Sequence, residues 1–153
     1  MTYRIKGLEP EPFAALFELD DTELEARGMT RMIVDNPNFP CRISLTDREV
    51  GEEVILLNHV SHDGNNPYRA SHAIFVSKAA QAADYVDAIP PALDRRILSL
   101  RAFDAKGMLV DAALAQPGQA DPSVRKLFAN PDAVHIDAHN ATRGCFAARI
   151  DRN

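Results

Sequence analysis

Two apolar runs joined by a short polar loop constrain the fold of this chain most strongly. Residues 53–60 read Glu-Val-Ile-Leu-Leu-Asn-His-Val, and residues 70–77 read Ala-Ser-His-Ala-Ile-Phe-Val-Ser. The loop 61–67 between them is rich in Asp, Gly, Asn and Pro, and it is too short for the crossover that parallel strands require. The two runs are therefore predicted to be antiparallel neighbours, with the strand at 54–57 buried on both faces.

The rest of the chain shows the same succession of short elements and turns. Strands are predicted at 3–8, 29–35, 97–103, 108–114, 134–138 and 145–150. Helices are predicted within 11–27, at 79–86, and after Asp121-Pro122, where Val124, Leu127 and Phe128 share one face. The turn chemistry at 104–107 is typical of a hairpin. The expected fold class is α+β, with a largely antiparallel, curved sheet of about seven or eight strands and about three short helices.

Length and charge limit the organisation and the partners of the protein. The 153 residues contain no repeat or linker, so one globular domain spanning residues 1–153 is expected. The net charge is -5, with 22 acidic and 17 basic residues. This acidic balance argues against binding nucleic acid through bulk charge and against a polybasic membrane anchor.

The N-terminal residues and the cysteines bear on location. Residues 1–7 lack the apolar run of a secretory signal, and no stretch approaches the roughly 18–20 apolar residues that span a bilayer. Cys41 and Cys145 are the two cysteines, which is too few for a disulfide framework. A cytoplasmic protein with two free thiols is expected.

Four stretches of the sequence resemble a known family. They are Phe39-Pro40-Cys41-Arg42, Gly51-Glu52, the run from Asn66 to Val76, and the run from Ala138 to Phe146. Together they resemble an uncharacterised family of bacterial proteins with a domain of unknown function, over nearly the whole chain. His72 departs from that family's pattern, which has a glycine there, so the resemblance implies that His72 is not a shared catalytic group.

The loop after the strand at 134–138 concentrates chemically capable side chains. It places a base (His139), an amide (Asn140), a cation (Arg143) and a thiol (Cys145) within seven residues. A nearby cation activates a thiol by favouring the thiolate. His139 faces Cys145 if the hairpin loop has five residues, whereas with a four-residue loop Cys145 pairs with Ala138 on the apolar face. A buried, structural Cys145 is the competing interpretation, because free cysteine is among the most buried residue types.

The leading hypothesis is a small-molecule pocket for an anionic ligand. His139, Asn140 and Arg143 would form it, with Tyr68 and Arg69 brought in from another strand, and any reaction would use acid–base or thiol chemistry through His139 and Cys145. An arginine near a strand end, such as Arg42, suits a carboxylate or phosphate. No phosphate loop, nucleophile elbow or zinc-protease motif is present. The alternative is a non-catalytic interaction module that forms a homodimer.

A metal-dependent enzyme is the third possibility. The alternating run His135-Ile136-Asp137-Ala138-His139 places three candidate ligands on one strand face. His135 and His139 would lie about 13 Å apart, too far to share one ion, but Asp137 and His139 could act with His59, His62 or His72. The competing interpretation is a polar, solvent-facing strand side, and surface positions are expected for His59 and His62. No cofactor and no metal site is predicted.

Overall fold

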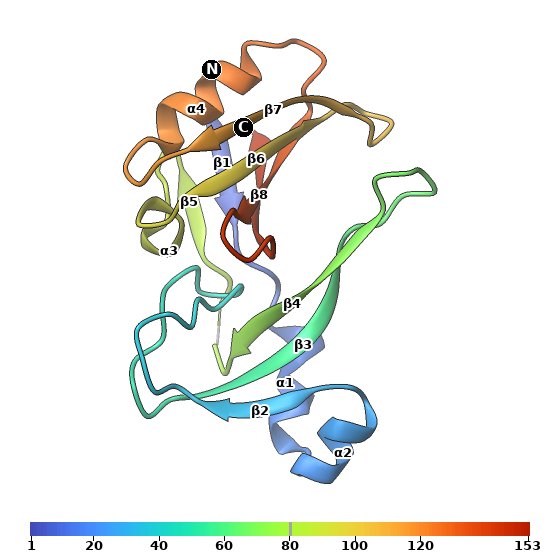
Figure 1. Cartoon of the computed structure of the whole chain (residues 1–153), viewed down its shortest axis with the longest axis vertical. Helices are drawn as coiled ribbons and strands as arrows, with labels where there is room; N and C mark the ends of the chain where they lie inside the picture. The colour runs from blue at the N-terminus through green and yellow to red at the C-terminus, as the bar shows by residue number, and fades with distance from the viewer. Residues whose placement is uncertain (80) are drawn as a thin grey trace.

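The chain folds into two antiparallel sheets with short helices against each. The computed structural model describes residues 1–79 and 81–153. The larger sheet has six strands in the order β5-β1-β9-β8-β6-β7, and the smaller has the order β2-β3-β4 (Figure 1). The strands are β1 (Tyr3–Lys6), β2 (Thr30–Ile33), β3 (Glu53–His62), β4 (Ala70–Ser77), β5 (Asp84–Val86), β6 (Leu98–Phe103), β7 (Leu109–Ala115), β8 (His135–Asn140) and β9 (Phe146–Arg152). The α+β class with a largely antiparallel sheet is confirmed.

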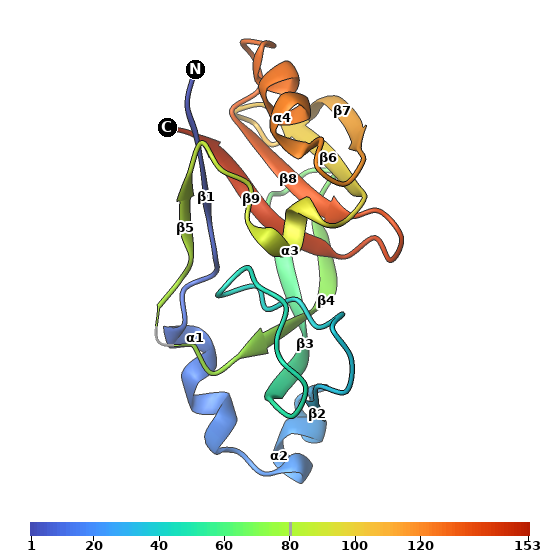
Figure 2. The same cartoon turned by 90° about the vertical axis from the view of Figure 1, so that its left-hand side faces the viewer.

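The helices divide between the two sheets. They are α1 (Glu11–Ala14), the 3₁₀ turn η1 (Ala15–Glu18), α2 (Asp21–Ala26), α3 (Pro91–Asp94) and α4 (Ala120–Phe128). Figure 2 shows α1 and α2 at the end of the small sheet that lies away from the large one. α2 begins with a reciprocal capping box between Asp20 and Glu23. None of the helices in the described part of the chain is both long enough and apolar enough to cross a membrane.

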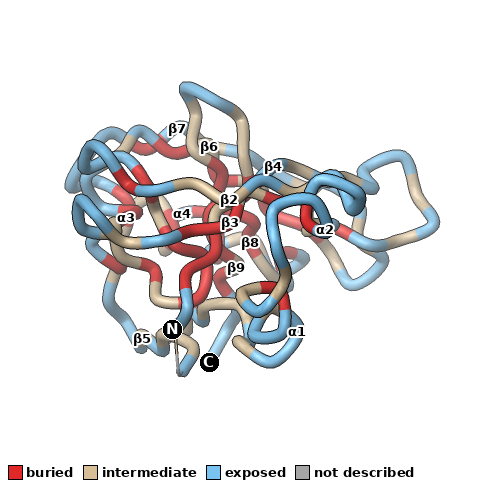
Figure 3. The backbone as a smooth tube through the Cα atoms, turned by 90° about the horizontal axis from the view of Figure 1, so that it is seen from below, coloured by how far each residue is buried: buried red, intermediate tan, exposed pale blue. Residues whose placement is uncertain are grey.

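Each sheet has its own apolar core. The predicted face of α4, formed by Val124, Leu127 and Phe128, packs with the buried residues of the six-stranded sheet. Leu16 and Leu24 pack against buried residues of β3 and β4. Figure 3 shows buried residues gathered in the central strands, with exposed loops at the periphery. The sheets are thus two separately packed layers, and the segments that join them control where the site forms.

The segment 40–43 joins the two sheets. The Arg42 backbone N–H donates to Phe75 O of β4 at 3.0 Å, and its carbonyl accepts from Leu8 N at 2.8 Å. A Cβ at Gly7 would lie 1.9 Å from the Ile43 carbonyl oxygen, so the chain after β1 approaches this segment more closely than any side chain permits. These contacts fix the position of Arg42 between the sheets.

Two sequence expectations are corrected. The predicted helix at 79–86 is wrong for Asp84–Val86, which forms β5 against β1, and residue 80 lies outside the described residues. Strand pairing, supported by an Arg4–Asp84 ion pair, overrides the helix propensity of the alanines. In β3, Val54, Ile55 and Leu57 are buried as expected, but Leu56 is only half-buried and lines a pocket.

Candidate functional site

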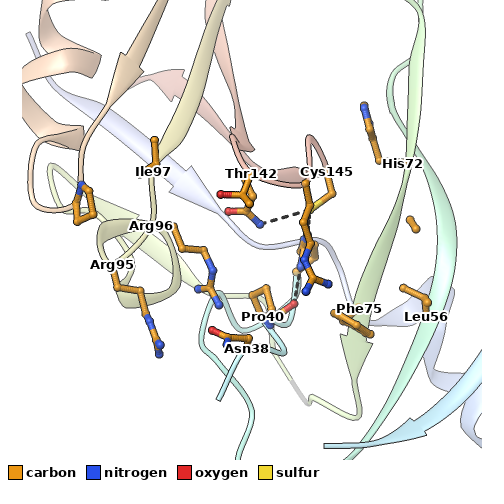
Figure 4. Close-up of a pocket in the computed structure, with 15 residues that line it drawn as sticks. Asn38, Pro40, Leu56, His72, Phe75, Arg95, Arg96, Ile97, Thr142 and Cys145 are labelled. Atoms are coloured by element: carbon orange, nitrogen blue, oxygen red, sulfur yellow. Dashed lines mark hydrogen bonds between the residues drawn. The ribbon is translucent and has the colours of Figure 1, made fainter. Parts of the chain in front are cut away.

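A pocket of about 640 Å³ lies between the two sheets (Figure 4). Its walls come from the segment before β3, from β3 and β4, from the residues that follow α3, and from the β8–β9 turn. It is lined by Asn38, Pro40, Arg42, Leu56, His72, Ala73, Phe75, Arg95, Arg96, Ile97, Pro117, Asn140, Thr142, Arg143 and Cys145. Among these described lining residues, four are arginines and none is an aspartate or a glutamate.

Arg42 is the most deeply placed of the four arginines. Arg42 is only 3% exposed, and this burial lowers the pKa of its guanidinium group. Nε donates to the Phe146 carbonyl at 2.7 Å, Nη1 to the Pro40 carbonyl at 2.6 Å, and Nη2 to the Cys145 sulfur at 3.2 Å. None of these partners carries a full negative charge when the thiol is protonated, so Arg42 places an uncompensated positive charge at the pocket wall.

Cys145 lines the pocket beside this charge. It is half-buried, and its sulfur accepts hydrogen bonds from Arg42 Nη2 and from Asn140 Nδ2, the latter at 3.5 Å. Figure 4 shows Cys145 among the lining side chains, near Thr142 in this view. The other thiol, Cys41, is fully buried and accepts from the Ser77 hydroxyl at 3.0 Å. Cys145 is therefore the reachable thiol, and Cys41 is a core residue.

The β8–β9 turn presents Asn140, Thr142 and Arg143 to the pocket. Asn140 N–H donates to the Cys145 carbonyl at 2.9 Å, and Gly144 N–H donates to the Asn140 carbonyl at 2.7 Å. Gly144 has φ +78°, a conformation that glycine adopts without strain. Arg143 is exposed and makes no ion pair, and the buried Asn140 Oδ1 atom has no hydrogen-bond partner, in the part of the chain that the structure describes.

Arg95 and Arg96 complete the arginine set from the end of α3. Both contact one acid, Asp47: Arg95 Nη1 at 3.0 Å and Arg96 Nη2 at 2.6 Å. Arg96 Nη1 also donates to the Ala92 carbonyl at 2.6 Å. One carboxylate thus serves two guanidinium groups, and the pocket keeps an excess of positive charge.

His139 lies beside the pocket, and its strand pairing answers the question of hairpin register that the sequence left open. It pairs with Phe146 across a register shift, so neither of the expected hairpin registers forms. Its Nδ1 donates to the Gly144 carbonyl at 3.0 Å, and its ring packs against His72 at 4.9 Å. Burial lowers the pKa of His139 to about 4. In this structure the His139 Nδ1 proton is donated to the Gly144 carbonyl, and the lowered pKa makes the ring a weak base at neutral pH.

The structure does not bring Tyr68 and Arg69 to this pocket. They lie at the β3–β4 hairpin, where Arg69 Nε contacts Asp63 at 3.2 Å and the Tyr68 ring packs against Phe103. The sequence suggested Arg69 as an arginine near a strand end that could bind an anion. That position does not determine which other segments the side chain meets in the fold, and in the structure Arg69 pairs with the nearby Asp63.

The strand β8 also differs from its predicted arrangement. Asp137 and His139 are 1% and 2% exposed, so this side of the strand does not face solvent. Asp137 is held by Arg149 at 2.8 Å, and its neighbours are His135 and His62 instead of His139. His62, expected at the surface, is buried as well, and His59 is half-buried.

Comparison with known families relates the chain to one described family. A family model described as a protein of unknown function, DUF1203, matches residues 38–152, a range that includes the whole pocket lining. No curated protein matches the chain, and no solved structure does.

Proposed function

The chain belongs to the DUF1203 family of proteins of unknown function, and we propose that its inter-sheet pocket binds a small anionic molecule. The observation that carries this proposal is the charge of the pocket. Four arginines line it without a lining carboxylate, and the two that Asp47 does not contact are Arg42 and Arg143. A cluster of guanidinium groups in a concave site is most stable with a bound anion.

The chemistry of the walls narrows the ligand class. Guanidinium groups match the planar geometry of carboxylates and the oxygen array of phosphates. Leu56, Phe75, Ile97 and Pro117 give the pocket apolar surface as well. A volume of about 640 Å³ is in the range of metabolite sites. The ligand class that fits is a small carboxylate or phosphate ester with an apolar portion.

Cys145 gives the pocket a nucleophile next to the buried Arg42 charge. Arg42 Nη2 donates a hydrogen bond to the Cys145 sulfur at 3.2 Å. A reaction at this site would use the thiol, with the ligand held by the arginines, and His139 could act in it only as a weak base. We place the protein in the cytoplasm, where reducing conditions keep such a thiol free.

Calorimetric titration tests the binding proposal. The wild type is titrated with inorganic phosphate, succinate, citrate and a sugar phosphate, and the same series is run on Arg143→Ala. Because Arg143 is exposed and lacks an ion pair among the described residues, the variant should keep its stability within about 1 kcal/mol. Its affinity for any anion that binds should fall tenfold or more, equivalent to about 1.4 kcal/mol.

Arg69→Ala is the matched control, since Arg69 is also exposed but lies at the β3–β4 hairpin. It should leave anion affinity unchanged. If no anion binds the wild type, or if the two variants lose the same affinity, the proposed pocket function is wrong.

A further inference from the structure

A second polar cluster lies apart from the pocket, where the end of β3 meets β8. It consists of His62, His135 and Asp137, whose nitrogen and oxygen ligand atoms all lie within 4.8 Å of one another. β8 provides His135 and Asp137, two residues apart on one face, and β3 of the other sheet provides His62. The Arg149 guanidinium holds the two sheets together here, because Nη2 donates to the Ser61 carbonyl at 2.9 Å while the group also binds Asp137.

The hydrogen bonds of His62 fix how its ring faces Asp137. Its Nε2 lies 3.0 Å from the Gly107 carbonyl oxygen, which can only accept, so the proton of a neutral ring is on Nε2. The Nδ1 lone pair then points toward Asp137 Oδ2 at 3.5 Å, without a hydrogen bond. The lone pair of His62 Nδ1 and the carboxylate oxygen of Asp137 therefore face each other with no proton between them. The His62 side chain is only 7% exposed.

His135 repeats this arrangement from the other side. Its Nε2 is buried, has no hydrogen-bond partner among residues 1–79 and 81–153, and lies 4.0 Å from Asp137 Oδ1. Two unpartnered ring nitrogens and one carboxylate thus surround the same small space. Buried polar atoms without partners are rare in folded proteins. A cation at the centre of this space would accept electron pairs from both ring nitrogens and from the carboxylate.

We propose that His62, His135 and Asp137 bind a divalent transition-metal ion, and that Zn²⁺ is the best fit. Two imidazoles and one carboxylate are a ligand set that zinc accepts, with water in the fourth position. Zinc–ligand bonds of about 2.0–2.2 Å place ligand atoms about 3.5 Å apart, so the side chains need to converge only slightly. This site is independent of the anion pocket.

The surroundings of the cluster support the assignment. The Gly107 carbonyl orients His62, and Arg149 holds Asp137 through Nε at 2.8 Å and Nη2 at 3.2 Å. Such outer contacts are usual around metal ligands, and a carboxylate retains free lone pairs after a bidentate contact. The Phe103 ring covers the cluster: its centroid lies 4.3 Å from the ring centroid of His62 and 5.4 Å from that of His135. The Arg149 charge opposes a second cation, so affinity should be weaker than in a structural zinc site with thiolate ligands.

The test uses metal alone. Chelator-treated wild type is titrated with ZnCl₂ by calorimetry and with CoCl₂ while visible absorption is recorded. One ion per chain should bind, ligand-field bands should appear with Co²⁺, and Zn²⁺ should raise the melting temperature. His62→Gln and His135→Gln should each weaken Zn²⁺ binding at least tenfold, a change measured on variants whose circular dichroism and melting confirm folding.

Three controls make the proposal falsifiable. His59→Gln removes a half-buried histidine of β3 outside the cluster and should retain wild-type Zn²⁺ affinity. Cys145→Ser should also retain it, which excludes the thiol as a ligand, and Arg143→Ala should bind Zn²⁺ while losing anion affinity. No Zn²⁺ or Co²⁺ binding by the wild type, or an equal loss in His59→Gln or Cys145→Ser, would overturn the metal site without affecting the anion proposal.

Discussion

Replacement of His139 by asparagine should remove much of the acid sensitivity of this fold. His139 is 2% exposed, and its Nδ1 donates to the Gly144 carbonyl, a bond that the Asn amide can imitate. Burial lowers the pKa of His139 from its ordinary 6.5 to about 4, with Arg101 and His72 also lowering it and Asp137 and the Gly144 carbonyl acting in the opposite direction. The neutral ring is therefore the form that the folded state accommodates.

The size of the effect follows from the two pKa values. Between pH 6.5 and pH 4 the unfolded chain binds a proton at this position that the folded chain does not, so stability falls as pH falls. The contribution of the neutral His139 ring to the free energy of unfolding is fully present above pH 6.5. Roughly 3 kcal/mol of it is lost by pH 4, since one pKa unit corresponds to about 1.36 kcal/mol. About 2 kcal/mol of this change falls between pH 7 and pH 5.

Urea denaturation of both proteins between pH 7.5 and pH 5 measures this contribution. Burial also lowers the pKa values of His59, His72 and His135, so the slope of the wild type alone is not diagnostic. The difference in unfolding free energy between wild type and His139→Asn isolates the one residue. At pH 7.5 the wild type should be the more stable, and its advantage should shrink by about 2 kcal/mol toward pH 5. Two stability curves that run parallel over this range would refute the argument.

Two further predictions concern the core strand and the thiols. Ile55→Asp should unfold the domain, because Ile55 is fully buried between β2 and β4 and an unpaired buried carboxylate costs several kcal/mol; an unchanged melting temperature would contradict this. Under native conditions iodoacetate should alkylate Cys145 and not the buried Cys41, and its rate relative to neutral iodoacetamide should fall in Arg143→Ala. Mass spectrometry reads both results, and a Cys41–Cys145 disulfide or preferential labelling of Cys41 would overturn the assignment of the reachable thiol.

Local patterns predicted the elements whose partners are close in sequence. The two apolar runs do pair as β3 and β4, and the turn at 104–107 does connect β6 to β7. The helix expected at 79–86 is wrong at Asp84–Val86 because its partner, β1, lies some 80 residues earlier in the chain. Propensity describes a segment by itself, whereas this pairing depends on a distant strand.

The same limit applies to the site. Asn140, Arg143 and Cys145 were recognised from one turn and do line the pocket, but Arg95 and Arg96 carry no local signal of function. Arg42 stood out only as one of several arginines near strand ends, and its burial beside Cys145 comes from the contacts of segment 40–43 with both sheets. For the metal cluster, strand spacing allowed Asp137 with His139 and a distant His62. His135 and His139 have the same spacing from Asp137, so spacing alone cannot decide between them, and it is His135 that lies next to Asp137 in the structure.

The pairing of β1 with β9 has a consequence for how the chain folds. Tyr3 lies opposite Arg152, and β5 reaches the six-stranded sheet only through β1. A contact between residues so distant in sequence closes a very large loop, and high contact order slows folding. Hairpins such as β3–β4 and β6–β7 can form early, whereas the edge of the large sheet must wait for its most remote partners. The pairing of β1 with β9 should therefore be among the last steps of refolding, and until it forms the edge of β9 is open to pairing with a strand of another chain.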